Sequence, residues 1–146
     1  MAIWQVDFYA IPKENAGCSV DSDEIYEWRK RRIRQINVDF LEKTDSWSEN
    51  MELYGKSDAT CMEFDFENSV LDSWFCRLDL TTLDKDLLEK IIRYIDDNDA
   101  VILYEDQIYS TDIETVLSII KSSAAARFCS NPQKFFEDLK ENSKDY

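Results

Sequence analysis

The strongest structural signal in the sequence is an alternation of large apolar and charged side chains near the middle of the chain. Met62, Phe64 and Phe66 are separated from one another by single acidic residues. A period of two is typical of a β-strand with one buried and one solvated face. A second run over residues 74–80 repeats the pattern after a turn near residues 68–69. The two runs therefore predict an antiparallel hairpin with its apolar rows stacked on the core side.

The same alternation predicts an acidic outer face for this hairpin. If Phe64 lies opposite Cys76, Glu63 faces Arg77 across the outer surface. Four carboxylates are expected on that face: Glu63, Asp65, Glu67 and Asp79. Clustered carboxylates can raise one another's pKa for acid–base chemistry or bind a divalent cation through oxygen. The favoured interpretation is the ordinary one, a solvated side of an antiparallel sheet.

Elements before the hairpin are less regular. Residues 2–11 alternate in the manner of a strand. Asp21 and Glu24 have the spacing of a helix N-cap and its N3 partner, which predicts a helix to about residue 35. Residues 37–58 have no clear period. This segment is expected to be a long surface excursion or to contain a short strand.

Elements after the hairpin follow clearer patterns. Residues 83–96 have an apolar stripe at helical spacing, with Thr82 as the expected N-cap. Residues 100–104 form a continuous apolar run, typical of a strand covered on both faces. Residues 108–109 can pair back as a short strand.

Two further helices are expected near the C-terminus. Thr111 and Glu114 have the capping-box spacing that opens one helix. Asn131 followed by Pro132 is a typical opening for the last helix, as N-cap and first helical residue.

The expected element order is β-α-β-β-α-β, followed by a short strand and two helices. The first six elements match the split β-α-β (ferredoxin-like) arrangement. The predicted fold class is therefore α+β, an antiparallel sheet with helices mainly on one face and two C-terminal helices. At 146 residues, one domain over residues 1–142 with a frayed tail at 143–146 is expected.

The charge balance limits the kinds of partner that the chain can bind. Seventeen Lys and Arg against 31 Asp and Glu give a net charge of −14. A field of this sign repels nucleic acid and anionic membranes and favours encounter with a basic partner. The acidity can also be explained by solubility alone. Basic residues cluster only at 29–34, where they can pair with the acidic domain or with a second copy of the chain.

The cellular compartment is inferred from the absence of targeting and membrane-spanning signals. The first residues show no signal peptide, and no apolar run approaches the length of a membrane span. A cytoplasmic location is therefore expected, with the four cysteines as free thiols. Of these, only Cys129 precedes an expected helix N-terminus, which lowers a thiol pKa.

Enzyme chemistry is restricted because the chain contains no histidine. Ser-His and Cys-His nucleophile pairs, imidazole bases and His-containing zinc sites are excluded. The two glycines, Gly17 and Gly55, are isolated, so no glycine-rich phosphate loop is present. No cofactor, metal or catalytic residue is predicted. Whether the chain is an enzyme stays open, with a non-enzymatic role favoured.

A second acidic group is the first choice for a partner-binding surface: Asp96, Asp97, Asp99, Glu105 and Asp106. Its first members follow a predicted helix C-terminus, where the helix dipole disfavours each acid by about 0.3–1 kcal/mol. Because these acids cost stability where they stand, the turn that carries them is a candidate contact surface. An ordinary solvated turn is the simpler explanation.

The preferred function is a small acidic interaction module that binds a basic protein. Immunity proteins and other inhibitors of nucleases have a similar size and charge, but no motif in the chain identifies such a family. The alternatives are a carboxylate-based cation-binding or acid–base enzyme domain and an accessory domain whose acidity serves solubility alone. The oligomeric state, a homo-oligomer included, stays open.

Overall fold

A computed structural model describes residues 5–28, 38–46, 48–68 and 70–123 of the chain. These residues form an antiparallel sheet with the strand order β2-β3-β4-β5-β1-β6-β7. The strands are β1 (Gln5–Pro12), β2 (Lys43–Thr44), β3 (Met51–Gly55), β4 (Cys61–Glu67), β5 (Val70–Asp79), β6 (Ala100–Tyr104) and β7 (Gln107–Tyr109).

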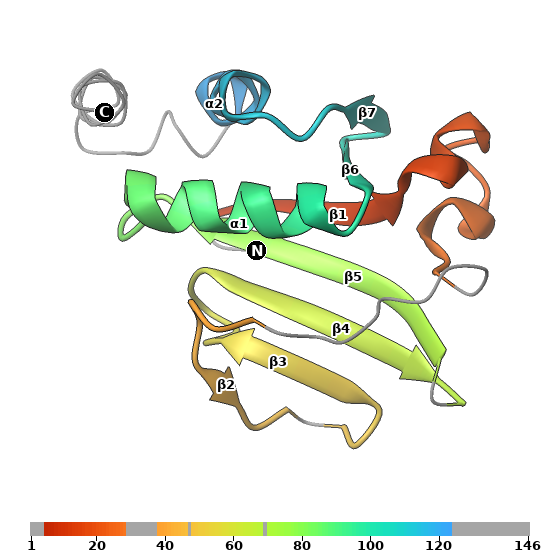
Figure 1. Cartoon of the computed structure of the whole chain (residues 1–146), viewed down its shortest axis with the longest axis horizontal. Helices are drawn as coiled ribbons and strands as arrows, with labels where there is room; N and C mark the ends of the chain where they lie inside the picture. Colours follow the sequence, from red (N-terminus) through yellow and green to blue (C-terminus); the bar gives the residue numbers. More distant parts are fainter. Residues whose placement is uncertain (1–4, 29–37, 47, 69, 124–146) are drawn as a thin grey trace.

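Within the described ranges, two α-helices and two short 3₁₀ helices accompany the sheet. They are η1 (Lys13–Gly17), η2 (Asp23–Tyr26), α1 (Lys85–Asp97) and α2 (Ile113–Ser122). The α+β class and the antiparallel sheet expected from the sequence are confirmed. In Figure 1, α1 crosses the near face of the sheet over β1, while β2 and β3 extend beyond it.

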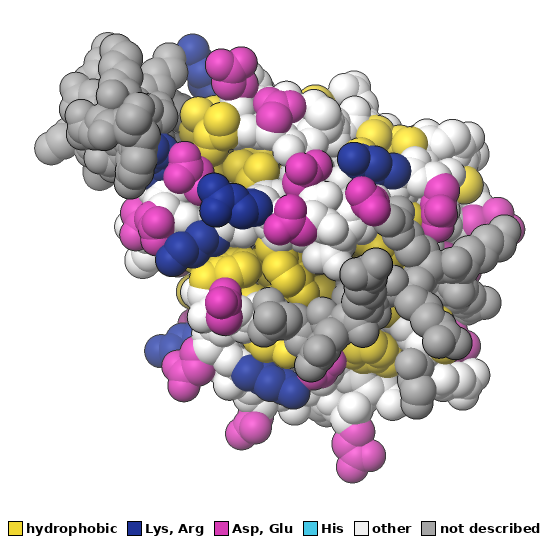
Figure 2. All heavy atoms as spheres, in the orientation of Figure 1, with side chains coloured by type: hydrophobic (Ala, Val, Ile, Leu, Met, Phe, Trp, Pro, Cys, Tyr) yellow, Lys and Arg dark blue, Asp and Glu magenta, His cyan; other side chains and the backbone are white. Residues whose placement is uncertain are grey.

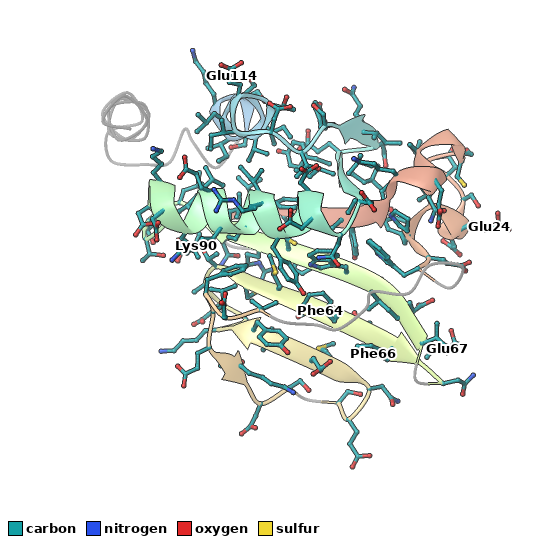
Figure 3. The ribbon with its side chains drawn as sticks, in the orientation of Figure 1. Glu24, Phe64, Phe66, Glu67, Lys90 and Glu114 are labelled. Atoms are coloured by element: carbon teal, nitrogen blue, oxygen red, sulfur yellow. The ribbon has the colours of Figure 1, made fainter. Side chains whose placement is uncertain are left out.

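The main core lies between the sheet and the two α-helices. β1 contributes Val6 and Phe8, which alternate with Asp7 as the sequence predicts, and both are at least 96% buried. Phe64 and Phe66 follow one another along β4, with Glu67 at the strand's end (Figure 3). The buried residues of α1 and α2 belong to the same cluster: Leu88, Ile91, Ile92, Ile95, Val116, Ile119 and Ile120.

A second, smaller core lies on the opposite side of the sheet. Ile11 and Leu103 point away from the main core and pack with Ile25 of η2. Strand β6 is therefore covered on both faces, as its continuous apolar run predicts, because Ile102 belongs to the main core and Leu103 to this one.

The hairpin of β4 and β5 is confirmed, but its predicted register is wrong by two residues. Phe64 pairs with Trp74 rather than Cys76, and Glu63 pairs with Phe75 rather than Arg77. A two-residue connection from Glu67 to Val70, together with one extra residue of β5 at Asp72, places Phe64 opposite Trp74. The sequence places the turn correctly near residues 68–69, but it does not reveal the bulge, and a shift of two residues keeps every side chain on its predicted face.

The helix expected from Asp21 to residue 35 is wrong over its first half. Only η2 forms, with Ser22 as N-cap, and Glu27 is already extended. Trp28 explains the early end, because its backbone N–H donates to the Asp72 carbonyl and its indole N–H to the Ala10 carbonyl. These contacts with the sheet outweigh local helix propensity. Residues 29–35 lie outside the described residues.

The other predicted helices begin later than expected. The N-cap of α1 is Asp84, whose carboxylate accepts the Leu87 N–H at 2.8 Å, and Thr82 lies in the preceding turn. The N-cap of α2 is Asp112 instead of Thr111, whose hydroxyl donates to the Ala100 carbonyl. Aspartate accepts these N–H groups at least as well as threonine.

Residues 37–58 contain two strands, β2 and β3, rather than at most one. The helix expected after Asn131 and the tail at 143–146 lie outside the described residues. Among the helices that the structure describes, none is long and apolar enough to cross a membrane.

Candidate functional site: the sheet face opposite the helices

The candidate site lies on the side of the sheet away from α1 and α2, here called the back face. The register places Leu53, Glu63, Phe75 and Tyr9 in one row across β3, β4, β5 and β1. Neighbours in such a row have Cβ atoms about 5 Å apart. A carboxylate thus lies between a leucine and two aromatic rings, where it is poorly hydrated.

Asp65 occupies the next row, two residues along β4 and about 7 Å from Glu63. Its Oδ2 accepts a long hydrogen bond from the Ser73 hydroxyl at 3.4 Å. Glu63 has no hydrogen bond or ion pair of its side chain within the described part of the chain. Both carboxylates are half-buried.

Partial burial raises the pKa of both groups. For Glu63, loss of water is the main cause, and the negative charges of Asp65 and Asp7 raise the pKa further against the opposing effect of Arg77. For Asp65, burial again raises the pKa more than the Ser73 hydrogen bond lowers it. The free protein therefore holds these charges at a cost in stability.

Arg77 and Asp7 form a bidentate ion pair on the same face. The Arg77 Nε and Nη2 atoms lie 2.9 and 3.1 Å from the two Asp7 carboxylate oxygens, and Nη1 donates to the Ser57 carbonyl. The guanidinium carbon lies 5.4 Å from the centroid of the Phe75 ring. One arginine is thus already held between a carboxylate and an aromatic ring.

The cysteines near this face are buried rather than reactive. Burial raises the pKa of the Cys61 thiol to about 12, although Arg77 lies on the neighbouring strand. Cys76 is also buried, in the main core. Cys129 lies outside the described residues, as does the basic cluster at 29–34.

Of the four carboxylates predicted on the outer hairpin face, two are half-buried neighbours, Glu63 and Asp65. Glu67 lies two residues beyond Asp65, at the end of β4, and is exposed. Asp79 is buried, and its Oδ1 accepts the Thr81 N–H and hydroxyl, which closes the turn after β5. Within the described residues, no group of three or more His, Cys, Asp or Glu is arranged to hold a metal ion.

The second acidic group is divided between the two ends of β6. Asp96, Asp97 and Asp99 lie at the end of α1, and Glu105 and Asp106 form the turn between β6 and β7. Six residues along a strand correspond to about 20 Å. Asp96 lies 3.9 Å from the Lys13 ammonium, so this end of the molecule is partly neutralised.

On the helix side, acidic groups alternate with basic ones. Dark blue and magenta side chains are interspersed along α1 in Figure 2, above an apolar band. Two of these pairs are the i,i+4 ion pairs Lys85–Glu89 at 3.4 Å and Lys90–Asp86 at 3.0 Å. Charge on this side is thus largely balanced locally.

Sequence reasoning did not identify Tyr9 and Phe75 as candidate site residues. The signal was present for Tyr9, because alternation along β1 places it on the same side as Asp7. Phe75 could not be assigned to the Glu63 row while the hairpin register was wrong.

Comparisons with protein-family models, with curated proteins and with solved structures find no match for this chain. The fold and the site therefore define the class directly: an acidic α+β domain with half-buried carboxylates and aromatic rings on one sheet face.

Proposed function

We propose that this domain is an interaction module that binds a basic protein partner on the back face of its sheet. Glu63 and Asp65 are the central residues, with Phe75 and Tyr9 as their apolar surroundings. The position of Glu63 between Leu53 and Phe75 is the observation that carries the proposal.

A half-buried carboxylate without a direct ion pair destabilises the free protein, and a cation that binds it relieves this cost. The Glu63 charge has this character, since burial dominates its pKa shift. A charge held in a poorly hydrated setting interacts more strongly with a partner than a fully solvated one. The net charge of −14 adds long-range attraction for a basic protein.

Selection of short random peptides on the immobilised domain tests this function. We expect the selected peptides to be rich in Lys and Arg. Their affinity, measured by titration calorimetry, should fall about tenfold or more in Glu63→Gln/Asp65→Asn, equivalent to about 1.4 kcal/mol or more.

A matched variant separates the back face from general acidity. Asp96→Asn/Asp97→Asn removes two charges from the exposed end of α1 and should leave the affinity nearly unchanged. Loss of binding in this variant instead would place the contact at the C-terminal end of α1. Selection of neutral or acidic peptides would argue against a basic partner altogether.

We further propose that the domain is an elaborated split β-α-β domain. The order β4-β5-β1-β6, with α1 between β5 and β6, supports this arrangement. The two described α-helices then lie on one face, while η2 covers the other beside Ile11 and Leu103 and leaves the part around Glu63 available for a partner. An experimental structure in which the strand order differs from β4-β5-β1-β6 would contradict it.

A further inference from the structure

A hollow of about 390 Å³ opens on the back face beside the Glu63 row. Its lining comes from three elements that are distant in sequence: Tyr9 of β1, the segment around η2, and β5. The lining residues are Tyr9, Asp23, Tyr26, Glu27, Asp72 and Ser73. This described lining contains three carboxylates and no basic side chain.

Aromatic rings form one wall of the hollow. The Tyr9 ring meets the Tyr26 ring edge to face, with centroids 4.8 Å apart and planes at 70°. On its other side Tyr9 meets Phe75, with centroids 5.5 Å apart. Cations are attracted to such rings within about 6 Å of the centroid.

A β-bulge shapes the β5 side of the hollow. Asp65 pairs with Ser73 and Phe66 with Leu71, so Asp72 is left without a cross-strand position. Bulges change the direction of side chains, often beside functional sites. Here the bulge places Asp72 and Ser73 next to each other on the rim of the hollow.

The η2 wall is held in place before any ligand arrives. The Asn15 side-chain amide donates to the Ile25 and Glu27 carbonyls at 3.2 and 2.7 Å. The Trp28 N–H donates to the Asp72 carbonyl at 3.3 Å, which joins the end of η2 to the bulge. A preformed wall lowers the entropy lost on binding.

We propose that this hollow receives the guanidinium group of an arginine from the basic partner. The inference rests on the proposed function and names the side chain that the back face recognises. Arginine is favoured over lysine because its planar group stacks on aromatic rings and bonds carboxylates in a fixed fork. Glu27 and Asp72 have other interactions of their own, so they contribute their field while the two tyrosine rings, Asp23 and Ser73 make the direct contacts.

The protein already contains one such arrangement on the same face. The Arg77 guanidinium lies over Phe75 and is bound by the Asp7 carboxylate. Tyr9 is in contact with the same Phe75 ring from the hollow side. The hollow therefore offers a second arginine the same combination of carboxylate and aromatic ring that binds Arg77.

The test uses three blocked short peptides of one length that carry arginine, lysine or citrulline at the same positions. Citrulline keeps the planar shape of the side chain but lacks the charge. Binding to the full chain is followed by amide chemical shifts. We expect the arginine peptide to bind about tenfold more tightly than the lysine peptide, the citrulline peptide not to bind, and the shifts to centre on Tyr26 and Ser73.

Variants of the hollow decide between a structural and a binding role. Tyr26→Leu should weaken arginine binding about tenfold, whereas Tyr26→Phe keeps the ring and should retain it. Asp23→Asn should weaken binding several-fold, while the charge-matched Asp106→Asn, at a turn that does not line the hollow, should not. Thermal denaturation of each variant verifies that it is folded.

Failure of this inference is distinct from failure of the proposed function. Arginine binding that depends on Glu63 and Asp65 but not on Tyr26 or Asp23 overturns the guanidinium site and keeps the back face as the partner surface. Equal binding of the arginine and lysine peptides also overturns it. Absence of binding by both basic peptides counts against the function and the inference together.

Discussion

Glu63 illustrates how one residue on a β-strand can oppose stability. Its cross-strand neighbours are Leu53, which is 97% buried, and Phe75, so water reaches the carboxylate from few directions. Asp65 adds a second negative charge nearby. A glutamine or asparagine of similar shape at these positions would avoid the charge and keep the packing.

We therefore expect Glu63→Gln and Asp65→Asn to stabilise the protein at pH 7, by a few tenths to about 1 kcal/mol each because both groups remain partly solvated. Their folded-state pKa values are raised, so the folded protein binds more protons than the unfolded chain between the ordinary and the raised values. The free energy of unfolding of the unaltered protein should then fall as pH rises through this window, from about pH 4 upward.

Chemical denaturation at several pH values checks this prediction. The stabilising effect of each substitution should be small at pH 4 and should grow toward pH 7. A gain that is the same at every pH would show that the substitutions act through packing instead of charge. A loss of stability at pH 7 would contradict the destabilising role of the two carboxylates.

At this scale, the sequence predicted the back-face position of Glu63 and Asp65 through simple alternation. It did not predict that Asp79 closes a turn, because the partner is the backbone of Thr81 in an irregular segment. It also missed Tyr26, which reaches Tyr9 only because η2 folds back over the sheet. Contacts of this kind join residues that are separated along the chain, and no sequence pattern indicates them.

At the scale of elements, the turn between β6 and β7 is the described connection with two consecutive non-glycine residues at positive φ. Glu105 and Asp106 link Tyr104 to Gln107 with φ values of 46° and 62°. A two-residue turn of this conformation prefers Asn-Gly, since side chains with a Cβ atom rarely adopt positive φ. Two consecutive non-glycine residues at positive φ are therefore unfavourable.

Glu105→Asn/Asp106→Gly should raise the free energy of unfolding by about 1 kcal/mol, because it relieves this strain. Thermal and denaturant unfolding measure the effect. The control Glu105→Gln/Asp106→Gln removes the same two charges and retains the strain, so it should give a clearly smaller change. Equal gains in both variants would assign the effect to charge repulsion.

The elements differ in whether the local sequence or contacts with other elements determine them. Strands β1, β4, β5 and β6 were predictable because a buried face leaves a period of two or a continuous apolar run. Register and helix starts were not, since they depend on the bulge at Asp72 and on the choice between adjacent cap residues such as Thr111 and Asp112. Strands β2 and β3 show no clear alternation and depend on pairing with β4.

At the scale of the whole molecule, the distribution of charge matters more than its total. Along α1, acidic groups have basic neighbours within the same helix. On the back face, Asp7 already binds the Arg77 guanidinium. The net charge of −14 thus acts in two ways, as self-repulsion within the folded chain and as attraction for a basic partner.

Added salt should consequently change folding and binding in opposite directions. Screening weakens self-repulsion, so raising NaCl from about 20 to 150 mM should raise the free energy of unfolding by about 1 kcal/mol, or Tm by about 3 °C for a chain of this size. The same change should weaken binding of a selected basic peptide by about tenfold, because screening also weakens the attraction between the acidic face and the peptide. Denaturation and calorimetry on one protein preparation compare the two effects. If binding strengthened with salt along with stability, apolar contacts would dominate the interface and the acidic back face would not be its main determinant.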